Sequence, residues 1–162
     1  MFLTIAIMTE GNRTSYHVRK PTGEDFRVVV CNAGGTSTPF SRPGTSAVVY
    51  CADPLTGHDF AVSANELGVL SAKRQGIAEA AISEQFGWRR VKTVADSLFR
   101  LQRRLQRLGW GEELLDRQTM IATAERLGLL DPRLLNTVTR IIHDAPAAQR
   151  TRRSKKKEGQ ME

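Results

Sequence analysis

Cysteine, histidine and aromatic residues are scarce in this 162-residue sequence, and it has no apolar run long enough to cross a membrane. The two cysteines, Cys31 and Cys51, each end an apolar stretch and form no CxxC motif. We expect small buried hydrophobic side chains there, with no disulfide or zinc site, as is usual for an intracellular protein. The apolar segment MFLTIAIMT at the start of the sequence lacks the basic residues with which a signal peptide begins, and Glu10 follows it directly. The sequence therefore predicts a cytoplasmic protein without signal peptide or membrane span.

Motifs for catalysis and cofactor binding are also missing. The sequence has no P-loop, HExxH or GxSxG motif, and its three histidines are scattered without the spacing of metal ligands. We therefore expect no catalytic residue, no cofactor and no metal, and predict a non-enzymatic protein. A small hydrolase with Cys51 or Cys31 as its nucleophile is the alternative that the residue types leave open.

Positive charge is abundant and unevenly distributed. The net charge is +7 and the sequence pI is about 10.0, yet residues 1–64 hold five basic and five acidic side chains. The excess lies in residues 86–108, with a net charge of +6, and in residues 146–162, with a net charge of +4. The intervening segments 65–85 and 109–145 are slightly acidic, at −1 and −2. An anionic partner is therefore expected to meet two segments of the chain.

The first 62 residues have the pattern of short β-strands joined by turns. Five runs rich in β-branched and aromatic residues, FLTIAIMT, TSYHVRK, FRVVVC, SAVVYC and HDFAV, are separated by segments with glycine, proline or asparagine. Residues 32–45 predict a long loop, and Asp53, Pro54 and Gly57 predict a tight turn. We expect a five-stranded antiparallel meander or small barrel, in which the aromatic side chains belong to the core rather than to a base-stacking surface.

Helical signals begin at Ser63. Ser63 and Glu66 form a capping box that predicts a short helix through Leu70, and Ser71 predicts the start of a second helix over 72–86, ended by Gly87. A third helix, over about 90–108, has apolar residues spaced four, three, four and three. These are Val94, Leu98, Leu101, Leu105 and Leu108.

Two further helices are indicated by their caps. Asp116 precedes the first, which Gly128 ends, and Asp131 with Pro132 begins the last, which Pro146 ends. The fold class predicted is α+β. It comprises a β-domain over 1–62, a bundle of four to five helices over 63–145 and a disordered basic tail over 146–162.

The helix predicted over 90–108 also has a stripe of arginines, at 100, 103, 104 and 107. Only one acidic residue, Asp96, lies four positions from any of them. Guanidinium groups this close repel one another unless an anion lies among them, and a nucleic-acid backbone supplies phosphates at regular spacing. The tail RTRRSKKK adds a second basic segment that needs no fold to follow such a backbone.

We therefore expect a nucleic acid as partner, DNA or RNA, bound mainly through its phosphates. A helix-turn-helix reading of helices 72–86 and 90–108 fits only in part, so sequence-specific readout is not expected. The candidate nucleic-acid-binding residues are Arg89, Arg90, Lys92, Arg100, Arg103, Arg104, Arg107, Arg150, Arg152, Arg153, Lys155, Lys156 and Lys157.

Four alternatives to this interpretation are open. The stripe could be a solvated face whose charge is neutralised by neighbouring glutamates. It could also bind an acidic protein or the surface of an anionic lipid membrane. Alternatively, the protein is an adaptor or inhibitor that docks on another protein through the β-domain or the helical surface.

Overall fold

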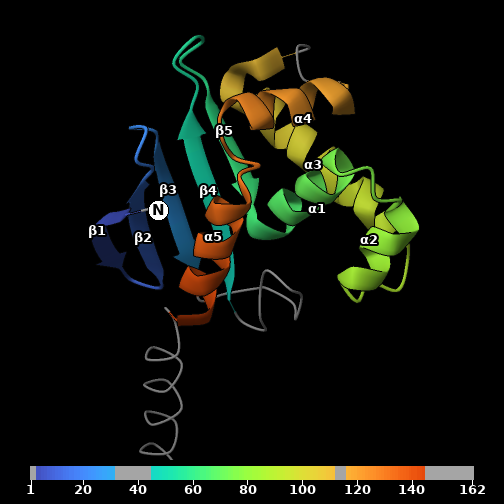
Figure 1. The fold of residues 1–162 in the computed structure, drawn as a ribbon, viewed down its shortest axis with the longest axis horizontal. Coiled ribbons are helices and arrows are strands. Elements are labelled where there is room, and N and C mark those ends of the chain that lie inside the picture. Colours follow the sequence, from blue (N-terminus) through green and yellow to red (C-terminus); the bar gives the residue numbers. More distant parts are fainter. Residues whose placement is uncertain (1–2, 32–44, 112–115, 145–162) are drawn as a thin grey trace, which may run out of the picture.

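The computed structural model describes residues 3–31, 45–111 and 116–144, and of residues 3–5 only the backbone. These residues form one antiparallel sheet followed by helices (Figure 1). The strands are β1 (Leu3–Glu10), β2 (Arg13–Arg19), β3 (Asp25–Cys31), β4 (Ser46–Ala52) and β5 (Asp59–Ser63). The helices are α1 (Ala64–Arg74), α2 (Glu79–Gln85), α3 (Lys92–Leu105), α4 (Arg117–Arg126) and α5 (Pro132–Asp144), with one π-helical turn, η1 (Gln106–Trp110), after α3.

The sheet is a meander in the order β1-β2-β3-β4-β5, so the predicted α+β class is confirmed. Of the two topologies expected, the structure has the open meander, because among the described strands β1 pairs only with β2 and β5 only with β4. The expected turn between β4 and β5 is present: the Gly57 amide donates to the Asp53 carbonyl at 2.8 Å, and Gly57 has a φ of 75°. The loop expected at 32–45 lies almost wholly outside the described residues.

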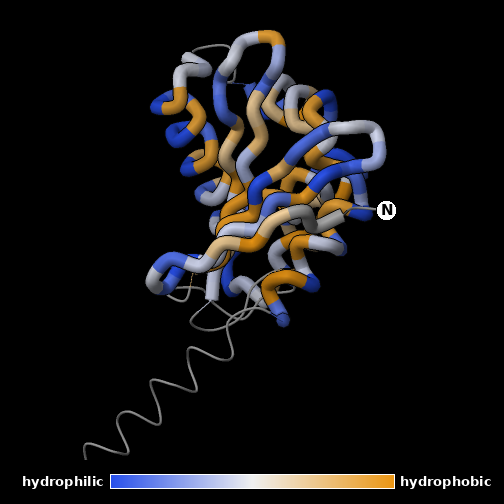
Figure 2. The backbone as a smooth tube through the Cα atoms, turned by 90° about the vertical axis from the view of Figure 1, so that its left-hand side faces the viewer, coloured by the Kyte–Doolittle hydropathy of each residue, from blue (hydrophilic) through white to orange (hydrophobic). Residues whose placement is uncertain are grey.

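One face of the sheet carries the core. Along β3, buried residues alternate with more exposed ones, as the two-residue period of a half-buried strand requires. Figure 2 shows hydrophobic segments, in orange, in both the strands and the helices. α1 packs near β4 and β5, α3 contacts β5, and α5 contacts β3. Buried residues of sheet and helices form one continuous cluster, so the segments before and after residue 62 share a core.

The aromatic residues of the sheet divide between its two faces. Phe26 and Phe60 are fully buried and Tyr16 packs against the same cluster, as expected for core residues. Tyr50 lies on the opposite face, where the Arg27 guanidinium lies 4.7 Å from the centre of its ring.

α1 begins where the sequence predicts but ends at Arg74 rather than at Leu70. Both hydrogen bonds of the Ser63–Glu66 capping box are present, but the expected helix start at Ser71 is wrong, because α1 continues through that residue. Leu70 and Ala72 are both buried, so packing favours an unbroken helix there. Gly76 ends it with a φ of 80°, which a residue with a side chain rarely adopts.

The later helices follow their sequence signals more closely. The buried side of α3 is the predicted apolar stripe, although α3 itself is shorter than 90–108. Asp116 caps α4 by accepting a hydrogen bond from the Gln118 amide at 3.0 Å, and Asp131 accepts one from the Arg133 amide at 2.9 Å at the start of α5. No helix within the described ranges combines the length and the hydropathy needed to span a membrane. The tail lies outside those ranges.

Candidate nucleic-acid interface

A groove of about 700 Å³ lies where the loop between α2 and α3 faces the start of α1. It is lined from four sides: the beginning of β4, the junction of β5 and α1, the α2–α3 loop, and one face of α3. Nine of its twelve lining residues have polar or charged side chains, with hydroxyl, amide, carboxylate and guanidinium groups. The lining residues are Ser46, Ser63, Asn65, Glu66, Phe86, Gly87, Trp88, Arg89, Thr93, Ser97, Arg100 and Arg104.

The α2–α3 loop is held in place by its own backbone. Gly87, with a φ of 71°, ends α2, and its amide donates to the Glu84 carbonyl at 3.1 Å. The Trp88 amide donates to the Ser83 carbonyl at 2.9 Å. The buried Ser83 hydroxyl in turn lies 3.1 Å from the Trp88 carbonyl oxygen and 3.2 Å from that of Arg90. This arrangement fixes the chain next to the groove.

Three of the predicted binding residues line this groove, namely Arg89, Arg100 and Arg104. Arg103 lies outside it, with its guanidinium 5.8 Å from the centre of the exposed Phe99 ring. The remaining described candidates, Arg90, Lys92 and Arg107, are exposed and do not line the groove. The candidates of the tail, from Arg150 to Lys157, lie outside the described residues.

Arg104 has an intramolecular partner. Its guanidinium donates to both carboxylate oxygens of Glu66, at 2.6 and 3.2 Å, and to the Ala61 carbonyl at 3.2 Å. The side chain of Glu66 is only 5 % exposed and also accepts the Ser63 amide at 2.8 Å as part of the capping box. Arg104 therefore joins α3 to the start of α1, and its charge is already balanced. The sequence did not reveal this pair, because the two residues are 38 positions apart.

The other cations of this segment differ from those elsewhere in the molecule. Of the seven basic residues between Arg89 and Arg107, only Arg104 forms an ion pair with another described residue. Of the ten other basic residues in the described ranges, seven form one. These seven are Arg19, Lys20, Lys73, Arg74, Arg117, Arg126 and Arg133.

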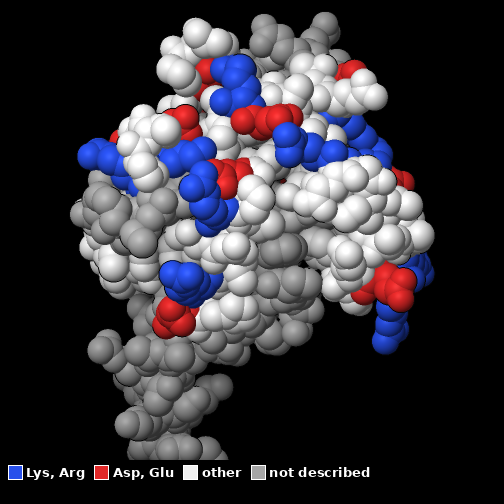
Figure 3. All heavy atoms as spheres, viewed as in Figure 1, with Lys and Arg blue, Asp and Glu red and all other residues white. Residues whose placement is uncertain are grey.

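The charge distribution on one face of the molecule agrees with this pairing. In the view of Figure 3, blue Lys and Arg side chains lie beside red Asp and Glu side chains, and they form no continuous basic surface. Glu79, at the start of α2, does not pair with the arginine stripe but with Lys73 at 3.7 Å and with Arg117 at 3.0 Å.

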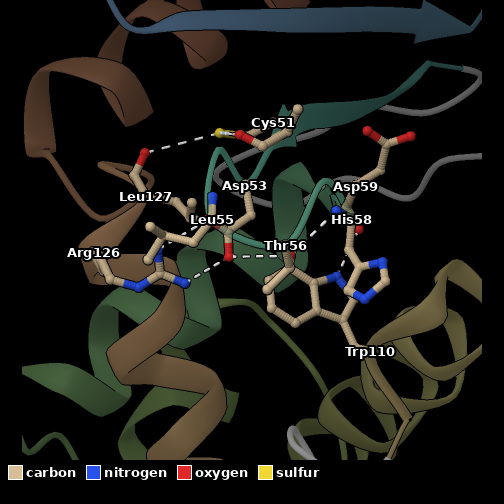
Figure 4. A network of polar contacts seen from close by, with 10 residues as sticks. Cys51, Asp53, Leu55, Thr56, His58, Asp59, Trp110, Arg126 and Leu127 are labelled. Carbon is tan, nitrogen blue, oxygen red and sulfur yellow. Dashed lines mark hydrogen bonds and ion pairs between the residues drawn. The ribbon is translucent and has the colours of Figure 1, made fainter.

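A second polar network joins the β4–β5 turn to α4 (Figure 4). Asp53 is fully buried, and Arg126 donates to both of its carboxylate oxygens, at 3.0 and 2.7 Å. The Leu55 amide donates to the same carboxylate at 2.9 Å, and the Thr56 hydroxyl lies 3.3 Å from it. The hydrogen bonds from Arg126 lower the pKa of Asp53 to about 2. With all its partners within the protein, this pair is structural.

Cys51 does not have the surroundings of an activated nucleophile. Burial raises the pKa of the Cys51 thiol to about 11, so it stays protonated, and its sulfur lies 3.9 Å from the Leu127 carbonyl oxygen. His58, the histidine nearest to Cys51 in the sequence, packs edge-on against Trp110 with ring centres 5.5 Å apart. Within the described ranges, no group of three or more His, Cys, Asp or Glu side chains is placed to hold a metal ion.

No protein-family model, curated protein or solved structure matches this chain. Within the described residues, the structure defines an α+β protein with an open five-stranded meander, five α-helices and a groove lined mostly by polar and charged residues. Two of these residues are arginines without an ion-pair partner among the described residues.

Proposed function

We propose that this protein binds nucleic acid without acting as an enzyme, through phosphate contacts made by the cations of residues 89–107 and by the basic tail. The observation that carries the proposal is the local excess of unpaired positive charge. Six of the seven cations between Arg89 and Arg107 have no ion-pair partner among the described residues, whereas seven of the ten other described cations have one.

The chemistry of these cations favours phosphate as the partner. Arginine presents several donors in a planar fork that matches phosphate oxygens, and binding by several arginines releases the counterions condensed on a nucleic-acid backbone. Arg104 is not among the proposed phosphate contacts, because its guanidinium already donates hydrogen bonds to both carboxylate oxygens of Glu66. The contacts proposed in the groove are those of Arg89 and Arg100, with the exposed cations around α3 adding further ones.

The salt dependence of binding tests this proposal. Changing Arg100 to Gln should weaken binding and reduce the slope of log K against log salt by about 0.7 to 0.9, the contribution of one phosphate contact. Removing residues 150–162 should reduce it further. The measurement is fluorescence anisotropy with labelled oligonucleotides over a range of salt concentrations.

The matched control is Arg74→Gln, because this surface arginine is already paired with Glu125. It should leave the slope unchanged. A wild-type affinity that does not vary with salt, or no binding at low salt, would contradict the proposal.

A second candidate function is supported by the edge of the sheet. In β1, Ile7 and Met8 are 63 % and 70 % exposed, and in the described residues the outer edge of this strand has no strand paired with it. An exposed, apolar edge strand is the kind of surface to which another protein adds a strand of its own. The protein would then be an adaptor or inhibitor.

Changing both Ile7 and Met8 to Lys should remove such a protein partner while leaving nucleic-acid affinity intact, because charged side chains on an edge strand oppose strand addition. The measurement is capture of partners from a nuclease-treated extract, compared by mass spectrometry. Leu55→Lys is the control, since Leu55 is 78 % exposed but lies in the β4–β5 turn. Capture of the same proteins by both variants would exclude the edge as the docking site.

A further inference from the structure

Trp88 gives the groove a feature that phosphate binding alone does not need. We infer that the groove takes a single-stranded nucleic acid, with a base against the Trp88 indole and a neighbouring phosphate at Arg89 and Arg100. This inference rests on the proposed function and adds to it the kind of nucleic acid bound.

The first step is the position of the indole. Trp88 is half-buried: its ring lies 4.6 Å from that of Phe86, it packs against the main cluster, and it also lines the groove. The hydrogen bonds from the Trp88 amide and to its carbonyl hold the backbone at this point. A tryptophan anchored on one side by Phe86 is a rigid surface, so a base stacking on it orders little that is not already ordered.

The second step is the charge of the groove. Three arginines line it against a single acidic residue, Glu66. Glu66 is buried and accepts hydrogen bonds from Arg104 and from the Ser63 amide, so it adds no free negative charge. Thr93 and Ser97, on the turns of α3 before Arg100, bring hydroxyl groups to the same wall. The groove as a whole therefore favours an anion.

The third step is the combination of the two. A positively charged groove with an aromatic side chain in it is the arrangement that proteins use to hold single strands, whose unpaired bases expose their flat faces. In a duplex those faces are stacked inside the helix, and Trp88, recessed against Phe86, does not extend to reach them. Arg89 follows Trp88 directly in the chain, so a base and its adjoining phosphate are met by adjacent residues.

The test compares a labelled oligothymidine with a hairpin duplex of equal nucleotide number, using the full chain at low salt. Trp88→Leu should weaken binding of the single strand about ten-fold, the usual effect of losing one stacked base, and leave binding of the duplex unchanged. Phe99→Leu is the matched control, because Phe99 is an exposed aromatic residue on α3 outside the groove. It should bind both probes as the wild type does.

A measurement on the wild type guards against a variant that fails to fold. The oligothymidine should quench the fluorescence of Trp88 on binding, since the only other tryptophan, Trp110, is 3 % exposed. Three results would overturn the single-strand inference and leave the proposed function standing. The first is unchanged fluorescence when the oligothymidine saturates the protein, and the second is weaker binding by Phe99→Leu in place of Trp88→Leu. The third is an equal loss of affinity for the single strand and the duplex in Trp88→Leu. If neither probe binds at low salt, the proposed function fails, and the inference fails with it.

Discussion

Replacing Arg126 with Ala should lower the free energy of unfolding by about 4 kcal/mol, because it leaves a buried carboxylate without its counter-charge. Asp53 is fully buried, and Arg126 supplies two of the hydrogen bonds to its oxygens. In the variant only the Leu55 amide and the Thr56 hydroxyl remain as partners. Denaturation in urea, followed by circular dichroism, measures the loss.

Removing the other partner of this ion pair, Asp53, should destabilise the protein less. In Asp53→Ala the guanidinium of Arg126 is left alone, but its side chain is 43 % exposed and becomes hydrated. We expect a loss of about 2 kcal/mol, and the double variant should resemble Asp53→Ala. The matched control is Arg74→Ala, whose partner Glu125 is half-exposed, and which should destabilise the protein less than either change at the buried pair. Equal losses for Arg126→Ala and Arg74→Ala would contradict a buried structural pair at Asp53.

The same pair should respond to acid in a defined direction. The hydrogen bonds from Arg126 lower the pKa of Asp53 from an ordinary value of 3.8 to about 2. A carboxyl group whose pKa is lower in the folded state contributes stability above its unfolded pKa and loses it as the pH falls through the folded pKa. The difference in stability between wild type and Arg126→Ala should therefore shrink as the pH falls from about 4 to about 2.

The features that sequence reasoning found correctly are those decided within a few residues. The Ser63–Glu66 capping box, the caps at Asp116 and Asp131, and the glycine turn at Gly57 each depend on groups at most four positions apart. The end of α1 does not follow from the sequence, because Ser71 is as compatible with a helix interior as with a cap. Packing of the buried Leu70 and Ala72 decides between the two, and the local sequence does not show that packing.

The candidate site was predicted less completely, because its partners are distant in the sequence. The spacing of the arginines places them on the polar side of α3 but gives no sign that Arg104 meets Glu66 across 38 positions. In the same way, nothing near Asp53 in the chain announces Arg126, 73 positions further on. Nothing in the local sequence singles out Trp88, because its importance lies in the groove, which forms only when α1, α3 and the α2–α3 loop come together.

Arg104 and Arg100 lie four residues apart on α3, but replacing each of them with Ala should affect stability very differently. Arg104→Ala should lower the free energy of unfolding by about 3 kcal/mol, since it leaves the buried Glu66 carboxylate with only the Ser63 amide. Arg100→Ala should change it by less than about 0.5 kcal/mol, because Arg100 is exposed and has no ion-pair partner among the described residues. Thermal and urea denaturation of the two variants measure the difference.

The two substitutions should affect nucleic-acid binding in the reverse order, with the larger effect from Arg100→Ala. Folded Arg104→Ala, assayed well below its unfolding transition, should keep the salt slope of the wild type, because Arg104 is already engaged by Glu66. Arg100→Ala should lose one phosphate contact from the slope. If Arg104→Ala is as stable as the wild type, or if its salt slope falls as that of Arg100→Ala does, Arg104 is a phosphate ligand like its neighbours. If instead the two effects separate, this stripe of arginines contains one residue that holds the groove together and others that are open to a ligand.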